Sequence, residues 1–219
     1  MARPRIVSDA QIDAAARSVF LEHGHGAPVA MVAAKLGVSH AALLQRAGSK
    51  DNLLMRALSL GTSFGPRSRD EPPPGTTTVA TVVARLRAGP PQLARASALA
   101  ALLLELHGLL ATILPGLIVL RARGLPTGLA PDAEAPTVLL RRNLAQWLGR
   151  TGVMTHKRAT VIAEALLGAI EARCFNAHVG GDAFITGEHP AFVEALVNGL
   201  VPELGRARRK TTTSKRQDS

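Results

Sequence analysis

The side chains best suited to recognition chemistry lie close together between residues 40 and 50. His40, Gln45 and Arg46 can all form hydrogen bonds, and Lys50 adds a second full positive charge. Glutamine can pair with the edge of adenine, and arginine can pair with guanine or with a phosphate group. This segment is therefore a candidate nucleic-acid contact, provided that one element presents these side chains on a common face.

Signals for catalysis are weaker. Residues 61–65 (GTSFG) match the G-x-S-x-G pattern of esterases, but that serine needs a strand before it and a helix after it. His23 and His25 have no cysteine or carboxylate at metal-ligand spacing. Cys174 follows Arg173, so it can be a redox sensor or an ordinary packing residue. We expect no enzyme activity, no bound metal and no cofactor.

A first short helix must support this segment from the N-terminal side. Ser8 and Gln11 have the spacing of a capping box, and Val7 and Ile12 have the spacing of a hydrophobic staple. Apolar residues then recur every three or four positions up to Gly24, where we expect the helix to end. The pattern predicts a helix with one apolar face.

Three more helices follow, and a tight turn separates the first two of them. Pro28 suits a first helical position, and Gly37 suits a left-handed helix stop. Ser39 caps the next helix, and Ser49 caps the last, which runs to about residue 58. Two helices joined by a short turn containing glycine form a helix-turn-helix, whose second helix can lie in the major groove of DNA.

This pattern resembles the TetR family of bacterial transcriptional regulators over about the first 58 residues. The matching residues are Ile12, Ala15, Ala16, Phe20, Gly24, Val29, Val32, Ala33, Gly37, Val38, Ser39, Leu43, Ser49, Lys50, Leu53 and Leu54. The resemblance implies a homodimer that binds a double-stranded DNA operator with the third helix of each head. The DNA-binding residues it implies are Ser39, His40, Ala41, Ala42, Gln45 and Arg46, with Lys50 on phosphate and Arg3 and Arg5 in an N-terminal arm.

Three positions depart from the pattern of that family. A small polar residue is usual where this chain has Ala42, and aromatic residues are usual where it has Leu44 and Ala47. The chain contains no tyrosine, so a tyrosine hydroxyl cannot donate to phosphate here. Three interpretations stay open: the head reads DNA through Gln45, Arg46 and His40, it binds DNA weakly or with unusual preference, or it has lost operator binding.

The rest of the chain is also predicted to be helical. We expect a DNA-binding domain over 1–60, a linker over 61–78 and a helical effector-binding and dimerisation domain over 79–205. Residues 206–219 read as a disordered basic tail. That tail carries a net charge of +5 out of the total of +10, so half of the excess charge lies outside the predicted folded domains. Helices are predicted at 79–87, 92–120, 137–149, 156–178 and 190–204, and Pro115 is expected to kink or split the second of these.

The resemblance places a ligand pocket in the later helices and a homodimer contact on the last two long ones. Glu105, His107, Trp147 and Met154 are the candidate ligand residues. The ordinary alternatives are a surface ion pair for Glu105, a satisfied core histidine for His107 and a core position for Trp147. The surrounding leucine, isoleucine, valine and alanine predict an apolar small-molecule effector. The predicted function is a repressor that this effector releases; the alternative is a helical binding or interaction protein that kept the fold but lost operator recognition.

The expected location is the cytoplasm. Cys174 is the single cysteine, so no disulfide can form within the chain. The first residues lack the apolar segment of a signal peptide. Residues 96–120 are apolar enough for a membrane span, but Glu105, His107 and Pro115 interrupt them. We interpret that stretch as core helix and expect no membrane partner.

Overall fold

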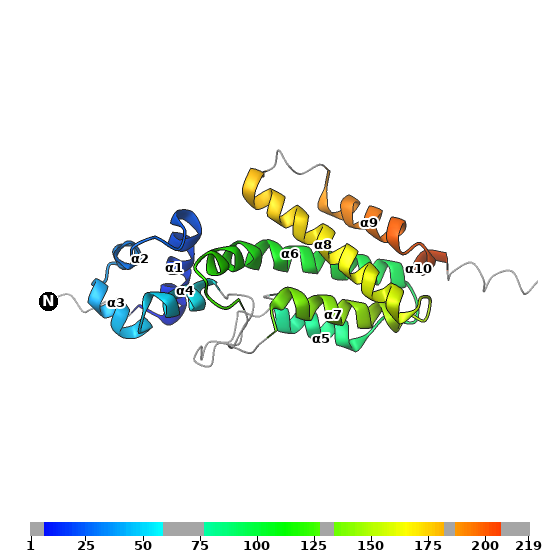
Figure 1. The fold of residues 1–219 in the computed structure, drawn as a ribbon, viewed down its shortest axis with the longest axis horizontal. Coiled ribbons are helices and arrows are strands. Elements are labelled where there is room, and N and C mark those ends of the chain that lie inside the picture. The colour runs from blue at the N-terminus through cyan, green and yellow to red at the C-terminus, as the bar shows by residue number, and fades with distance from the viewer. Residues whose placement is uncertain (1–6, 59–76, 128–133, 182–186, 207–219) are drawn as a thin grey trace, which may run out of the picture. The chain divides into compact units, whose positions relative to one another are not determined.

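The computed structural model describes residues 7–58, 77–127, 134–181 and 187–206 (Figure 1). These ranges contain helices and no strand, which confirms the predicted all-α class. By its contacts the chain forms two compact units. The first unit holds the residues up to Thr78 together with Thr112–Pro136, and the second unit holds Val79–Ala111 together with the residues from Thr137 onward.

The described helices follow the predicted segments closely. They are α1 (Asp9–His23), α2 (Val29–Leu36), α3 (His40–Ala47), α4 (Lys50–Leu58), α5 (Val79–Ala88), α6 (Arg95–Ala122), α7 (Pro136–Gly149), α8 (His156–Gly180), α9 (His189–Leu200) and α10 (Glu203–Arg206). The beginning of α5 coincides with the predicted end of the linker. The functional roles assigned to the predicted domains stay predictions, and almost all of 61–78 and 206–219 lies outside the described residues.

Two of the boundaries that differ from the predicted ones lie at prolines; α6 also begins at Arg95 rather than at residue 92. Pro28 lies just before α2 as its cap rather than inside the helix, with an extended backbone (φ −66°, ψ 140°). The last long helix, predicted to reach residue 204, ends at Leu200. Pro202 disfavours helical backbone at Val201, which adopts φ −136° and ψ 49°, so the chain resumes only as the short α10.

The start of α1 is fixed by its own side chains. The Ser8 hydroxyl accepts from the Gln11 amide at 3.2 Å, and the Gln11 side chain accepts from the Ser8 amide at 2.8 Å. The predicted capping box is therefore confirmed. Val7 and Ile12 are both buried, as expected for the staple. The position of the first turn thus follows from local sequence alone.

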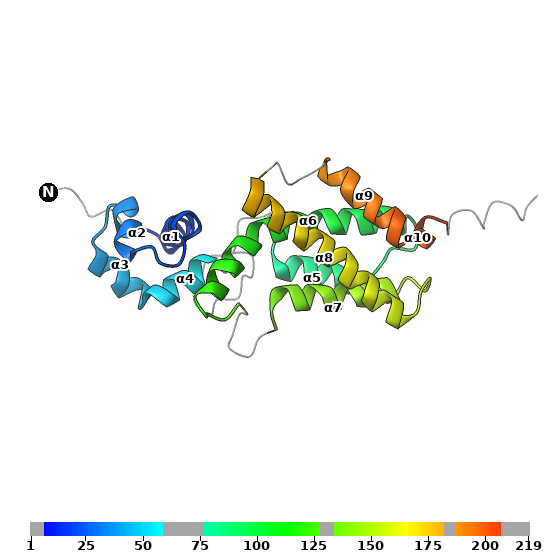
Figure 2. The same ribbon diagram turned by 45° about the horizontal axis from the view of Figure 1, so that its top comes forward.

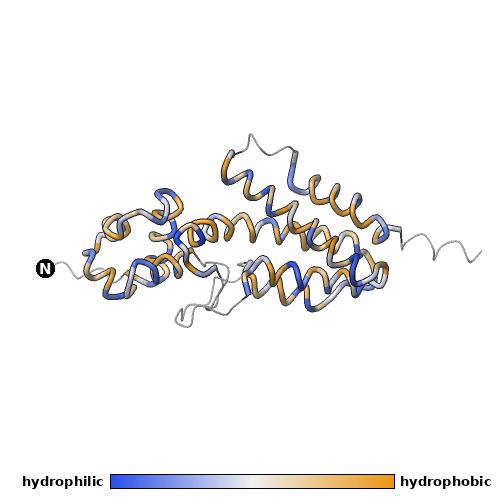
Figure 3. The backbone as a smooth tube through the Cα atoms, viewed as in Figure 1, coloured by the Kyte–Doolittle hydropathy of each residue, from blue (hydrophilic) through white to orange (hydrophobic). Residues whose placement is uncertain are grey.

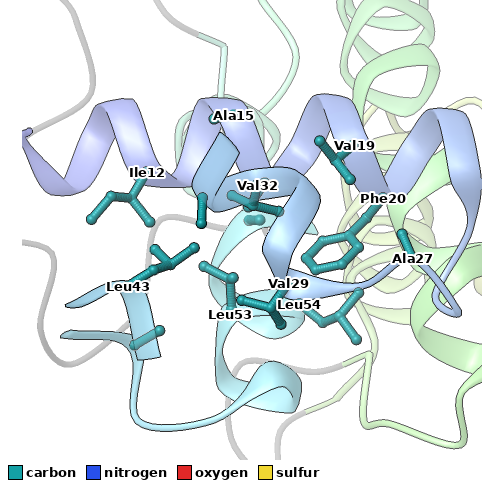
Figure 4. Packing of buried hydrophobic residues seen from close by; sticks show 14 of the residues in the cluster. Ile12, Ala15, Val19, Phe20, Ala27, Val29, Val32, Leu43, Leu53 and Leu54 are labelled. Carbon is teal, nitrogen blue, oxygen red and sulfur yellow. The ribbon is translucent and has the colours of Figure 1, made fainter. Parts of the chain in front are cut away.

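One apolar core joins α1 to α4. Phe20, Val32, Leu53 and Leu54 are completely buried in it, and Figure 4 shows these side chains pointing into the space between the four helices. Fully burying side chains of this size contributes about 1.5–3 kcal/mol each. Isolated helices of eight or nine residues are unstable in water, so this core is what holds α2, α3 and α4 in place.

Helix α6 is shared between the two units, and its last part packs in the first. Leu120 is completely buried in the core of α1–α4. Gly116 lies against the end of α4 so closely that a Cβ atom placed there would be 2.6 Å from the Leu58 carbonyl oxygen. Arg17 donates to the carbonyl of Thr112. The part of α6 from Thr112 to Ala122 therefore packs with α1–α4.

The apolar length of α6 has a packing explanation. By length and composition it is the one helix among the described residues that is long and apolar enough to cross a membrane, and Figure 3 shows most of it coloured as hydrophobic. Eight of its leucines and one of its two isoleucines occupy buried positions along its length: Leu99, Leu102, Leu103, Leu106, Leu109, Leu110, Ile113, Leu117 and Leu120. Pro115 does not split the helix, contrary to one of the two predicted outcomes. The composition of α6 follows from this buried role.

The second unit is a helical bundle in which α5 and α7 lie side by side and α8 and α9 form a pair (Figure 2). Trp147 is only 1% exposed, so it occupies a core position. Arg150 closes the end of α5, because its guanidinium donates to the carbonyls of Leu86 and Arg87. Thr155 caps α8 through the Arg158 amide. Apolar packing and helix-end hydrogen bonds thus define this unit as well.

The close approach at Gly116 predicts a steric effect that can be measured. Gly116→Ala should destabilise the protein by about 1–3 kcal/mol, because the added methyl group overlaps a backbone carbonyl. The matched control is Gly108→Ala on the same helix, where a Cβ meets no atom within 4 Å. That control should stabilise the helix by up to about 1 kcal/mol. Urea unfolding of both variants tests this, and equal stability of the two would contradict the packing described.

Candidate nucleic-acid interface

The turn between α2 and α3 sets the direction of the third helix. Gly37 adopts a left-handed conformation (φ 68°, ψ 30°), and its amide donates to carbonyls at the end of α2. A side chain is strained at this φ, which explains the glycine. Ser39 then accepts from the Ala42 amide at 3.1 Å. Both signals were visible in the sequence, and the predicted helix-turn-helix geometry is present.

Helix α3 has one buried side and one exposed side. Leu43 and Ala47 face the core, and Leu44 is half-buried. The side chains of His40, Ala41, Ala42 and Gln45 are exposed, and we call these four residues the reading edge. The first two turns of α3 therefore present an imidazole, two methyl groups and a side-chain amide to the solvent.

Arg46, which the sequence suggests as a base or phosphate contact, is engaged within the head. Its guanidinium donates to the carbonyl of Val7 and to the carboxylate of Asp9. Arg56 lies 3.8 Å from the same carboxylate and donates to Asp13 at 2.7 Å. Asp9, Asp13, Arg46 and Arg56 thus form a charge network that links α1, α3 and α4.

Sequence reasoning missed this charge network for an identifiable reason. Asp9 lies in the first turn of α1, where an acidic group is favourable in any helix. Arg46 is 37 residues from Asp9, and no local pattern predicts a contact at that separation. Burial raises the pKa of Asp13, and the nearby Arg56 opposes that rise.

The other expected DNA contacts differ in their surroundings. Ser39 is exposed at the cap of α3. Lys50, at the start of α4, donates to the carbonyl of Gly26 at 3.1 Å. One backbone amide at the start of α4 is already engaged in the helix cap, because the backbone N–H of Asn52 donates to the Ser49 hydroxyl at 3.0 Å. Arg3 and Arg5 lie outside the described residues.

The four expected ligand residues occupy different environments in the second unit. Glu105 forms an ion pair with Arg85, and Trp147 is core. Met154 is half-buried between α7 and α8. A surface hollow of about 350 Å³ is lined by Gln146, Gly149, Arg150 and His156. None of the four expected residues lines it, and its walls are more polar than the predicted apolar site, which stays a prediction.

His107 belongs to a cluster that the sequence did not suggest. Its ring lies 3.9 Å from the ring of His189 at the start of α9. Arg173, only 8% exposed, donates through Nε to Nδ1 of His189 at 3.0 Å and lies over the ring of Phe192. Burial, His189 and Arg173 together lower the pKa of His107.

Cys174 behaves as a packing residue. The thiol is buried, and its nearest polar partner is the carbonyl of His107 at 3.7 Å. Burial raises its pKa to about 11, although Arg173 opposes this rise. A thiol with such a pKa is almost entirely protonated at neutral pH, so it is a poor nucleophile. The redox-sensor interpretation loses its main support.

The fold identifies the structural relatives of the chain. A TetR-like transcriptional regulator from Rhodococcus sp. RHA1 matches 91% of this chain and 98% of its own, with a TM-score of 0.60 and 22% sequence identity. The chain has the TetR-like fold. A second transcriptional regulator from Rhodococcus sp. RHA1 matches with the same score and identity over 92% and 97% of the two chains.

A third solved structure is more distant, and sequence comparison adds no relative. That structure concerns the control of antibiotic production by bacterial hormones; it has a TM-score of 0.50 and 18% identity over 90% of this chain and 95% of its own. No family model and no curated protein matches the sequence. The TetR resemblance of residues 12–54 is thus confirmed at the level of the fold, now over nearly the whole chain.

The histidine cluster predicts a dependence of stability on pH. The pKa of His107 is lower in the folded protein than in the unfolded chain. Its neutral form therefore supports folding above about pH 6.5, and this contribution is lost as the pH falls through the lower folded value. Replacing it by glutamine should flatten the decline in melting temperature between pH 7.5 and 5.

The control for this prediction is His40→Gln, which removes an exposed imidazole from α3. This variant should keep the wild-type profile of melting temperature against pH. If His107→Gln and His40→Gln both retain the wild-type slope, the cluster around Arg173 does not contribute to the pH dependence.

Proposed function

We propose that this protein is a DNA-binding transcriptional regulator of the cytoplasm that uses α3 to bind a double-stranded operator. The observation that carries the proposal is the exposed reading edge on a helix held by a packed helix-turn-helix core. The TetR-like fold over more than nine-tenths of the chain supports it. Operators of such dimers have half-sites about one helical turn apart, roughly 34–36 Å.

Dimerisation through α8 and α9 is part of this proposal. The exposed face of α8 carries a row of apolar or small side chains at helical spacing: Val161, Ala165, Ala172, Phe175 and Val179. Val161 and Val179 are 65% and 67% exposed in the single chain. Exposed apolar side chains of this size are costly in water, and small residues between them allow a second helix to approach closely. We propose that a second copy of the chain covers this face of α8.

The proposed regulation is release from the operator by a small apolar ligand bound in the second unit. The ligand must bind the DNA-free form more tightly than the bound form, because only a difference in affinity shifts the equilibrium. A repressor of this kind loses operator affinity as the ligand saturates. The leucine-rich interior of the second unit supports an apolar ligand, and Glu105, His107, Trp147 and Met154 remain the proposed ligand residues.

The alternative function is a helical binding protein that kept the fold but does not recognise an operator. Two observations favour it. Ala42 and Leu44 cannot donate a side-chain hydrogen bond to phosphate, and Arg46 is held within the head.

A binding assay at fixed salt separates the two functions. The regulator should bind its own upstream DNA at least ten-fold more tightly than a shuffled duplex of the same length. Lys50→Ala should weaken both duplexes alike and reduce the salt dependence by about one ion per head, whereas Gln45→Ala should reduce the preference. Equal affinity of the wild type for both duplexes would reject the regulator and support the alternative.

The dimer contact predicts a change of mass. Ala172→Arg places a charge in the middle of the exposed α8 row and should convert the protein into a 22.9 kDa monomer in light scattering. The control is Ala84→Arg, an exposed alanine of α5 outside that row, which should leave the dimer intact. A wild type that is already a monomer at micromolar concentration would contradict the proposed interface.

A further inference from the structure

The charge network changes what α3 can offer to DNA. Two of its four members are carboxylates and two are guanidiniums, so the charges of Asp9, Asp13, Arg46 and Arg56 cancel locally. The network also ties the last turn of α3 to the first turns of α1. Arg46 therefore makes contacts within the protein that an arginine surrounded only by solvent would lack.

For Arg46 to reach a base edge, it must give up two contacts. One guanidinium nitrogen donates to the carbonyl of Val7, and another donates to Asp9. The side chain is 42% exposed, so the pair is partly screened by solvent but has defined geometry. An arginine that recognises guanine needs the same two-nitrogen fork free. The end of the guanidinium that forms these two contacts is therefore not free to pair with a base edge.

The chemistry that remains on α3 favours one kind of base pair. Gln45 can form two hydrogen bonds with adenine, and alanine methyl groups contact the methyl group of thymine. Ala41 and Ala42 precede Gln45 by four and three residues, so they share its face of the helix. His40 at the first position can bond to a base or a phosphate. Adenine and thymine therefore match the reading edge better than guanine does.

We propose that Arg46 is a positioning residue held by Asp9, and that the reading edge selects half-sites at A·T base pairs through Gln45 and Ala41. This inference rests on the proposed DNA-binding function. Asp9 lies on α1, outside the helix that would contact DNA, yet it determines specificity in this proposal. Its carboxylate holds Arg46 and so keeps that side chain out of the major groove. Removing the Asp9 carboxylate should free the Arg46 guanidinium to contact DNA, which it does not do in the wild type.

The experiment is selection of DNA from a random library by the full-length wild type and by single variants. The wild type should select half-sites with an A·T pair opposite Gln45. Arg46→Gln should keep the same consensus and lower the affinity for all sequences to a similar extent. Gln45→Ala should lose roughly 5- to 100-fold of preference at one position.

The decisive variant is Asp9→Asn, which preserves shape and removes the charge that holds Arg46. It should gain a preference for guanine at one position, or a salt dependence steeper by about one ion per head. The matched control is Glu22→Gln, an exposed acid at the far end of α1 whose carboxylate lies 3.8 Å from His23 Nε2. That variant loses the same charge but should keep the wild-type consensus and salt dependence.

The outcomes separate this inference from the function on which it rests. A wild type that selects a guanine which Arg46→Gln abolishes overturns the inference and leaves the regulator standing. A wild type that selects no sequence overturns both. If Asp9→Asn unfolds, Arg46→Gln and Arg46→Lys still test the inference. An unchanged DNA consensus in both variants supports the positioning role of Arg46, and a changed consensus in either rejects it.

Discussion

Three of the four helices in the head have only eight or nine residues, and helices of that length do not persist alone in water. Burial of one shared set of apolar side chains against α1 holds them. Phe20 and Leu54 are completely buried there, and Leu120 adds a contact from α6. The reading edge points outward because the opposite side of α3 must supply Leu43 to this core. The surface that can meet DNA is thus a consequence of which side of α3 is buried.

Much of this arrangement could be predicted from the sequence because its causes are local. The capping box at Ser8, the left-handed stop at Gly37 and the cap at Ser39 each act within three or four residues. Leu43, one of the residues that carry the family resemblance, is buried in the core. The missed end of α9 had a local cause too, since Pro202 restricts the residue before it.

The side-chain environment of the candidate site was less predictable, because its causes are distant in the chain. Arg46 meets Asp9 across 37 residues, and Gly116 meets Leu58 across a longer separation still. When only α3 is considered, Arg46 is predicted to be available for contact with a base or a phosphate. The contact positions at Ala42, Leu44 and Ala47 departed from the family pattern, and the structure adds that the nearby arginine is also engaged. Under the proposed function, α3 would contact base pairs through the Gln45 amide and alanine methyl groups rather than through Arg46.

Hydrogen–deuterium exchange of the full-length protein, with and without a duplex that it has selected, tests the central claim most directly. The account places DNA on the exposed side of α3 and on the turn that begins at Gly37. Peptides covering residues 37–47 should therefore show the largest slowing of exchange when DNA is added, and peptides of α5 and α7 should show little. Slowing that is absent from residues 37–47, or largest in α5 and α7, would contradict the account.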